Sequence, residues 1–221
     1  MSAAAPSPNE ITALRSGAAL VDRSGGGRLS LSGSQAKEAL SAVVTNEIEA
    51  LSPGHGCLAA CCTAKGRMLG DLRVLATDAE LLLDMERCAL QPIFDAIRHG
   101  LVGYEAELHK RTLQTSLFSL LGPQSRAIAG ADSLGESEDD NVAAELGGRP
   151  VLLITTNLGV DVLCSAEDQA PVRDALLADG ATAADEALAE LARIESGRPR
   201  YGVDLDETVI PEEGGLNDRA V

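Results

Sequence analysis

The sequence predicts an α+β fold built from two related lobes. Segments with strand periodicity alternate with segments of helical periodicity, and the order strand, helix, hairpin, helix occurs in both halves. The chain is also large enough for a core, because it has 221 residues of which 45% are hydrophobic. We therefore expect one compact body with two lobes. The residues of the two halves do not repeat, so the duplication rests on the order of elements.

The first half begins with strands that lead into a helix. Leu20–Ser24 and the alternating run Arg28–Ser32 are predicted strands. Ser34 can cap a helix that continues to Val44 with its apolar side chains on one face. A hairpin follows, in which Gly66 supplies the positive φ of the turn. The later expected elements are the strands Cys57–Thr63, Met68–Thr77 and Glu80–Met85 and the helix Arg87–His99.

The second half has a similar outline. Its expected elements are a strand over Thr112–Leu121, a short helix from Gly122–Pro123 to Ala129, a hairpin of Val151–Thr155 and Val160–Cys164, and the helices Ala166–Ala178 and Ala183–Ser196. Between them, Asp132–Gly148 is acidic and bounded by glycine, which is typical of a solvated surface excursion. We expect residues 1–16 to be a disordered N-terminal tail, although Glu10–Ala18 can form a short helix, and residues 17–221 to be the domain.

Charge and cysteine usage limit the function classes. The formal net charge of -16 disfavours direct nucleic-acid binding, because that binding depends on Lys and Arg at the phosphates. The five cysteines include no CxxC pair and no metal-ligand spacing, and four of them lie in apolar runs. We therefore expect reduced thiols, no metal site and a cytoplasmic location. We also expect neither a secretory leader nor a membrane-spanning segment.

Asp71 is the first candidate for chemistry. It lies in an apolar run, where alternation sets it on the face of Leu69 and Arg73. Gly70 beside it would let a ligand approach the backbone. The alternative is an edge-strand acid that is paired with Arg73 or faces water.

Glu195 is the second candidate. It ends a predicted helix and leads into a long loop with neither helix nor strand periodicity, and such loops commonly line functional sites. The alternative is a solvated helix end close to Arg193.

The same loop carries a family resemblance. Residues 193–213 read RIESGRPRYGVDLDETVIPEE. The preceding landmarks, in order, are Leu20–Ser24, Leu31–Gly33, Val44–Asn46, Leu51–Gly54, Lys65–Asp71 and Gly122–Pro123. Together they resemble the folate-binding domain shared by the glycine-cleavage T-protein (aminomethyltransferase, GcvT) and the YgfZ-type folate-binding proteins. The resemblance implies the T-protein-type fold over residues 17–221 and tetrahydrofolate as the cofactor.

The resemblance also implies a site. Glu195 matches the glutamate that binds the pterin, whose adjacent ring N–H and amino group can both donate to one carboxylate. Asp71 matches the aspartate near the reacting folate nitrogens, which stabilises charge or relays a proton. We expect the two to face a common cavity between the lobes. The other implied folate-binding residues are Arg23, Asn46, Met68, Leu69 and Tyr201.

Three functions stay open. The favoured one is a tetrahydrofolate-binding protein of YgfZ type, acting with iron–sulfur client proteins in cluster maintenance or in tRNA modification. The second is an enzyme, either an aminomethyltransferase or a folate-linked demethylase domain, with Asp71 as its acid or base. The third is a shortened paralogue that binds no folate. Gly66–Arg67 and the ending Pro211–Leu216 look closer to YgfZ, but its Lys-Gly-Cys-Tyr motif and the family's barrel domain do not occur in these residues. We therefore expect a fragment or a shortened homologue.

Overall fold

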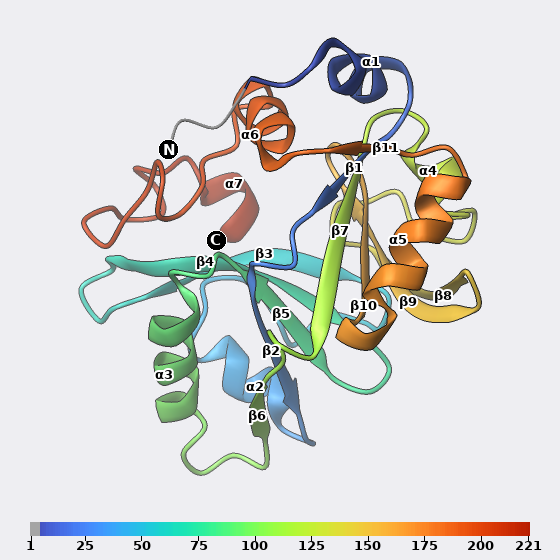
Figure 1. Cartoon of the computed structure of the whole chain (residues 1–221). Coiled ribbons are helices and arrows are strands. Elements are labelled where there is room, and N and C mark those ends of the chain that lie inside the picture. Colours follow the sequence, from blue (N-terminus) through green and yellow to red (C-terminus); the bar gives the residue numbers. More distant parts are fainter. Residues whose placement is uncertain (1–4) are drawn as a thin grey trace. The chain divides into compact units, whose positions relative to one another are not determined.

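The structure is a computed structural model that describes residues 5–221 and divides into two compact units, where one compact body was expected (Figure 1). Unit 1 contains the chain up to Gly25 together with Leu113–Arg198, and unit 2 contains Gly26–Thr112 and Pro199–Val221. Each unit holds one β-sheet, and helices α1–α7 of the described residues complete a mixed α+β fold. The predicted fold class is confirmed. Within residues 5–221, no helix combines the length and the apolar composition needed to cross a membrane.

Unit 2 is built on a five-stranded antiparallel sheet with the strand order β3-β4-β5-β2-β6. Its strands are β2 (Gly27–Ser32), β3 (Gly56–Cys62), β4 (Met68–Ala76), β5 (Leu81–Met85) and β6 (Glu107–Lys110). Its helices are α2 (Ala36–Ser41), α3 (Leu90–Gly100) and the short α7 (Asn217–Ala220).

Strand β4 has one face in the core of unit 2. Leu72 on this face belongs to the same buried cluster as Leu83 of β5 and Ile93 of α3. Gly70 lies on the same face with a φ of 151°, and an added Cβ would sit 2.5 Å from the Cβ of Ala89. The glycine thus lets the residue before α3 approach the strand. This packing role differs from the expected one of admitting a ligand.

Unit 1 is built on a six-stranded sheet with the strand order β11-β1-β7-β10-β9-β8. Neighbouring strands are antiparallel except β1 and β11, which are parallel. Its strands are β1 (Ala19–Asp22), β7 (Thr115–Leu121), β8 (Asn141–Leu146), β9 (Arg149–Thr156), β10 (Gly159–Ser165) and β11 (Thr182–Ala184). Its helices are α1 (Pro8–Ser16), α4 (Ser125–Ile128), α5 (Gln169–Ala178) and α6 (Glu186–Glu195), with the 3₁₀ turn η1 (Ala166–Asp168).

The sheet of unit 1 contributes to two hydrophobic clusters. Leu20 of β1 belongs to one cluster with Val172 of α5, and the next residue, Val21, belongs to another with Leu188 of α6. This follows from strand geometry, because successive side chains point to opposite faces. Helix α6 is therefore held by its apolar side, which fixes its last residue, Glu195, within unit 1.

The topology of the two sheets confirms the related lobes. The elements of unit 2 run β2-α2-β3-β4-β5-α3-β6, and the later elements of the chain run β7-α4-β8-β9-β10-α5-β11. The sheet orders also match, with β1 inserted between β7 and β11. Gly33 after β2 and Gly122 after β7 have φ values of 117° and 124°. An added Cβ would sit 2.3 Å from the carbonyl oxygen of Glu105 and 2.6 Å from that of Gly17, respectively. The same strand-to-helix turn therefore occurs twice.

The N-terminal segment differs from the expected disordered tail. Residues 8–16 form α1, which begins with a reciprocal cap between Ser7 and Glu10. Such a capping box satisfies two backbone N–H groups at the helix start. Residues 1–4 of the expected tail lie outside the described residues.

The acidic segment between α4 and β9 also differs from the expected surface excursion. It contains strand β8, which pairs with β9. Asp139 and Asp140 are only 4% and 7% exposed. The Asp140 carboxylate accepts the backbone N–H of Ser137 at 2.9 Å, and its carbonyl accepts the N–H of Thr155 at 2.8 Å. The acidic composition of the segment did not predict that Asp139 and Asp140 are buried in a hydrogen-bonded turn.

Candidate functional site

The loop after α6 spans residues 197–216 and contains no helix or strand of its own, as the sequence predicts. It enters unit 2 at Pro199. There, buried Tyr201 donates its hydroxyl to the carbonyl oxygen of Met68 over 3.4 Å. The N–H of Met68 in turn donates to the carbonyl of Val209 at 3.0 Å. The loop is thus attached to the start of β4, close in sequence to Asp71.

Asp71 is half-buried on the face of β4 that also carries Leu69 and Arg73, as alternation predicts. The alternative pairing with Arg73 does not occur, because Nη2 of Arg73 lies 2.7 Å from Oδ2 of Asp84 on β5. The pKa of Asp71 is raised to about 6, mainly by burial. The backbone N–H of Asp71 lowers the pKa in part, and the nearby charge of Glu86 raises it further. A carboxyl group with this pKa can hold or release a proton near neutral pH.

Two apolar residues were expected to form a wall beside Asp71. Leu69 shares the face of Asp71 and is half-buried. Met68 is fully buried in the core of unit 2. Leu69 is therefore the better positioned of the two to contact a ligand that reaches Asp71.

Asn46 follows α2 in unit 2, and its side-chain amide is bonded to the backbone. Its Nδ2 donates to the carbonyl oxygens of Leu58, at 2.8 Å, and Arg219, at 3.2 Å. Its Oδ1 accepts the N–H of Glu47 at 2.8 Å. These bonds connect β3 to α7, which is a structural function for a residue expected to bind the cofactor.

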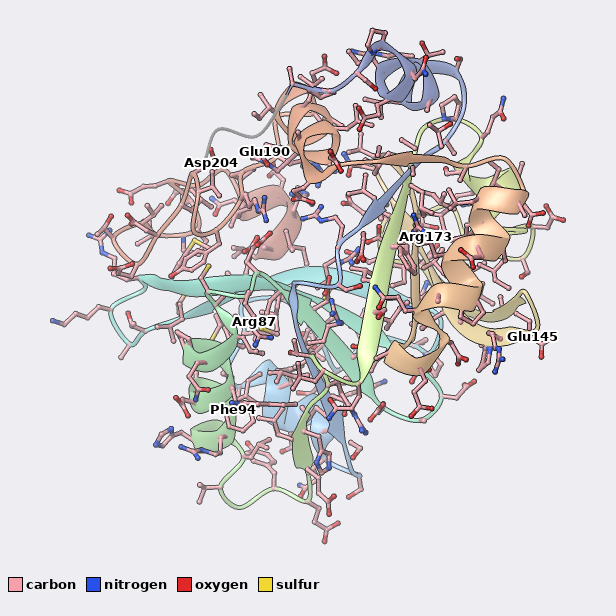
Figure 2. All side chains as sticks on the ribbon, in the orientation of Figure 1. Arg87, Phe94, Glu145, Arg173, Glu190 and Asp204 are labelled. Atoms are coloured by element: carbon pink, nitrogen blue, oxygen red, sulfur yellow. The ribbon has the colours of Figure 1, made fainter. Side chains whose placement is uncertain are left out.

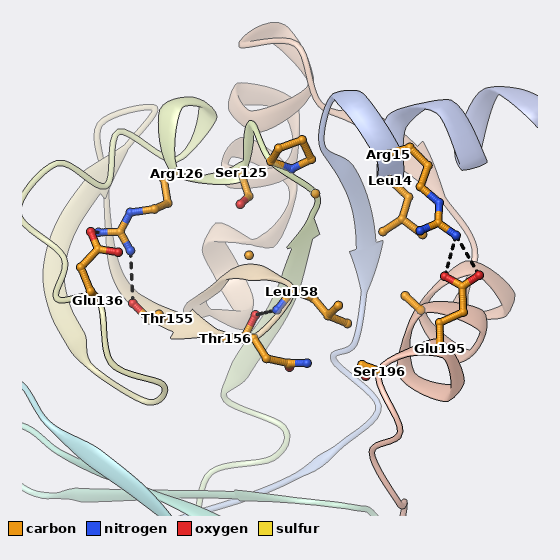
Figure 3. A pocket seen from close by; sticks show the side chains of 15 residues that line it. Leu14, Arg15, Ser125, Arg126, Glu136, Thr155, Thr156, Leu158, Glu195 and Ser196 are labelled. Atoms are coloured by element: carbon orange, nitrogen blue, oxygen red, sulfur yellow. Dashed lines mark hydrogen bonds and ion pairs between the residues drawn. The ribbon is translucent and has the colours of Figure 1, made fainter.

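Glu195 faces Arg15 at the end of α1 (Figure 3). A single guanidinium nitrogen of Arg15, Nη2, lies 2.8 Å from each carboxylate oxygen of Glu195. Both side chains are exposed, at 61% for Arg15 and 43% for Glu195. Arg193, the neighbour considered from sequence, instead lies 2.6 Å from Glu190.

The Arg15–Glu195 pair lines a groove in unit 1, which we call the unit 1 groove, with a volume of about 560 Å³. Figure 3 shows Ser125 and Leu158 between this pair and a second ion pair, Arg126–Glu136, whose atoms approach to 3.4 Å. The volume lies within the range of small-molecule sites, about 300–1,000 Å³.

Arg23 also belongs to unit 1, but it does not line this groove. Its Nε lies 3.5 Å from Oε2 of Glu186, the first residue of α6. Of the predicted site residues, Glu195 and Arg23 lie in unit 1, and the others, including Asp71 and Tyr201, lie in unit 2.

Three polar residues of these regions were missed from sequence: Arg15, Glu86 and Arg200. Nε and Nη2 of Arg200 lie 2.7 and 3.1 Å from the two carboxylate oxygens of Glu86. The register of the β4–β5 hairpin offers a signal for Glu86, because one step beyond its last pair, Leu72 with Met85, would set that residue across from Asp71. No local pattern points to Arg15, which meets Glu195 across 180 positions of sequence.

Comparison with known proteins gives a family. The model of the GCVT N-terminal domain matches residues 2–220. The chain is 26% identical over 220 residues to an aminomethyltransferase of Streptomyces coelicolor and 22% identical over 219 residues to one of Staphylococcus epidermidis. These matches cover 94% of this chain and 59% and 60% of the relatives, so the chain spans less than two thirds of their length.

Two solved structures support the fold. The glycine cleavage system aminomethyltransferase T from Bartonella henselae aligns with a TM-score of 0.80 at 19% identity, over 92% of this chain and 57% of that one. A heterotetrameric sarcosine oxidase from Corynebacterium sp. U-96 aligns with a TM-score of 0.54 at 19% identity, over 79% and 85% of the two chains. Since the family model covers nearly the whole sequence, this chain belongs to the GCVT N-terminal domain family.

Proposed function

We propose that this chain binds tetrahydrofolate and takes part in folate-dependent one-carbon transfer of the aminomethyltransferase type. Family membership and the names of the relatives support this proposal. The observation that carries it is Asp71, a half-buried carboxyl at the motif position for proton chemistry, with a pKa raised to about 6 mainly by burial. Such a group is suited to general acid–base catalysis near neutral pH.

Glu195 is proposed to bind the pterin ring. Its two oxygens can accept the adjacent ring N–H and amino group, and charge-assisted bonds of this kind are among the stronger hydrogen bonds. The unit 1 groove beside it has the volume of a small-molecule site. These features fit tetrahydrofolate, which would supply the nitrogen atoms that take up a one-carbon unit.

Asp71 is proposed to hold the proton that is exchanged during transfer. When ionised, its charge would also stabilise a developing positive charge nearby. Leu69 and Tyr201 are proposed to contact the ligand beside it. Arg23, Asn46 and Met68 are proposed to support the binding residues, because their polar atoms or side chains already have contacts within their own units.

The finer assignment to YgfZ-type proteins, with iron–sulfur clients or tRNA modification, has less support than the enzyme alternative. The relatives named above are aminomethyltransferases. Because the chain spans less than two thirds of those relatives, a complete aminomethyltransferase reaction and its protein partners belong to the proposal. We also propose a cytoplasmic location, in which the five cysteines stay reduced.

Calorimetric titration with tetrahydrofolate tests this function. We expect saturable binding that weakens in Asp71→Asn and in Glu195→Gln. A matched control is Glu145→Gln, which alters an exposed carboxylate on β8 of unit 1 (Figure 2) and should bind as the wild type does. Absence of binding by the folded wild-type protein would contradict the proposal and favour the non-binding paralogue.

A further inference from the structure

The hairpin of β4 and β5 brings two carboxylates across from each other. Leu72 pairs with Met85, and Arg73 pairs with Asp84. Strand β5 ends at Met85, so Glu86 directly follows it, and one further step of the same register would set Glu86 opposite Asp71. Directly opposed residues of an antiparallel pair point to the same face, with Cβ atoms about 4.5–5.5 Å apart.

Like charges at this separation repel each other, and the two carboxylates have different partners. Glu86 receives the guanidinium of Arg200 in a two-pronged contact at 2.7 and 3.1 Å, and both side chains are about one quarter exposed, at 26% and 24%. Among residues 5–221, no side chain donates a hydrogen bond to Asp71. Arg200 therefore compensates the charge of Glu86, whereas burial without such a partner favours the neutral form of Asp71.

We propose that Asp71 and Glu86 form a cross-strand carboxylate pair, in which Arg200 keeps Glu86 charged and Asp71 carries the exchangeable proton. Glu86 and Arg200 are then positioning residues that act through Asp71. This inference rests on the proposed function for its catalytic meaning, because a proton held on Asp71 is the one available to the folate. The pair itself is a property of the protein without ligand.

The surroundings of Asp71 in unit 2 support its assignment as the residue that carries the proton. The raised pKa of Asp71 has burial as its main cause, and the charge of Glu86 also raises it. On the same face, Arg73 is engaged with Asp84 on β5, and the residue of β3 opposite Asp71 is the uncharged Ala60. Tyr201 of the loop is a further titratable neighbour, and its pKa is raised by burial first and by the charges of Glu207, Cys88, Asp206 and Asp71 in turn. A carboxyl group whose environment raises its pKa, beside a second carboxylate that is ion-paired, is an arrangement suited to acid–base chemistry in enzymes.

Arg200 also helps to hold the loop in place. Its backbone N–H donates to Oδ2 of Asp204 at 2.9 Å, and the N–H of Gly202 donates to the carbonyl of Leu205 at 2.7 Å. Asp204 is labelled in this loop in Figure 2. The contact with Glu86 therefore also holds the turn that carries Tyr201.

The test is a titration of the Asp71 carboxyl by carbon-13 NMR in the free protein, with Asp71→Asn used to assign its signal. Glu86→Gln removes the neighbouring negative charge, so the midpoint of Asp71 should fall by at least about half a pH unit. Arg200→Gln leaves the charge of Glu86 uncompensated, so the midpoint should rise, or the two carboxyls should titrate in two coupled steps. Arg98→Gln is the matched control, since Arg98 is an exposed partner of Asp95 on α3, and it should leave the midpoint unchanged.

Opposite shifts in the two variants support the pair. An unchanged midpoint in Glu86→Gln, or shifts of the same sign in both variants, overturns it. If Arg200→Gln does not fold, Arg200→Lys retains the charge without the two-pronged geometry and should shift the midpoint upward by less. The titration needs no folate, so a failure of folate binding would count against the proposed function and leave this result standing.

Discussion

Asp71 and Glu195 are both carboxylates, but their surroundings give them different properties. Asp71 is half-buried beside the charge of Glu86, and its pKa is raised to about 6. Glu195 is exposed and is bonded to Arg15 through both oxygens. The first residue is therefore suited to proton exchange and the second to binding a pair of hydrogen-bond donors.

Replacing Asp71 by Asn should stabilise the protein above pH 6. The folded-state pKa of Asp71 is higher than its unfolded value of about 4, so its contribution to stability is complete below pH 4 and is lost as the pH rises through about 6. Asn carries no charge, so we expect the free energy of unfolding at pH 8 to increase by about 1–3 kcal/mol. Because Asp71 is only half-buried, solvent screening favours the lower end of this range. Urea unfolding at several pH values measures this. A gain that does not shrink between pH 6 and pH 4 would show that the penalty is not the charge of Asp71.

Replacing Arg15 by Ala should tighten tetrahydrofolate binding. Nη2 of Arg15 is equidistant from the two oxygens of Glu195 and so occupies the position that two adjacent pterin donors would need. An exposed ion pair contributes about 0.2–1 kcal/mol, which corresponds to an affinity gain of roughly 1.5- to 5-fold on its removal. Arg173→Ala, on α5 in unit 1 (Figure 2), is the matched control. Weaker binding in Arg15→Ala would mean that Arg15 orients Glu195 instead of competing for it.

At the scale of elements, each unit contains the same strand-to-helix turn, after β2 in unit 2 and after β7 in unit 1. Gly33 and Gly122 occupy it with positive φ, and each lies against a backbone carbonyl oxygen of its own unit. A side chain at either position meets both a disfavoured backbone conformation and a steric conflict.

We predict that Gly33→Ala and Gly122→Ala each destabilise the protein by more than about 2 kcal/mol. Gly25→Ala is the matched control, because Gly25 has no atom within 4 Å of an added Cβ and no positive φ. Thermal or urea unfolding of the three variants measures the difference. Equal stabilities of the three variants would contradict this prediction, because they would show that neither turn requires glycine.

The elements also mark the limit of prediction from sequence. Alternation in β4 correctly set Asp71 on the face of Leu69 and Arg73, since that pattern depends only on neighbouring residues. Strand β8 and the buried Asp139 that precedes it were not predicted, because such a short strand is defined only by its pairing with β9. Short strands such as β11 likewise take their definition from a distant partner, here β1.

For the candidate site, motif order nominated Asp71 and Glu195, and their roles stay predictions. The sequence said nothing about which groups contact them. Arg15 and Arg200 approach their partners from remote segments, and such pairs cannot be derived from local periodicity. The bonds of Asn46 to the backbone were also beyond the sequence, because they join β3 to α7.

At the scale of the whole molecule, the two units carry one candidate carboxylate each, on β4 of unit 2 and at the end of α6 in unit 1. The chain also has a formal net charge of -16. An anionic folate would therefore bind against a general repulsion, and its recognition would have to come from specific local hydrogen bonds. This makes the affinity sensitive to single acceptors such as Glu195.

The most direct measurement of this account is the tetrahydrofolate affinity of Glu195→Gln by calorimetry, together with its unfolding in the absence of ligand. The substitution preserves side-chain volume but turns one acceptor into a donor that faces a ligand donor. We predict that binding weakens by roughly tenfold or more, because a pterin donor left unsatisfied in the complex costs about 1–3 kcal/mol, while ligand-free stability stays close to that of the wild type. Wild-type affinity in the variant would contradict the assignment of Glu195 to the pterin, and loss of folding would show that Glu195 serves the structure.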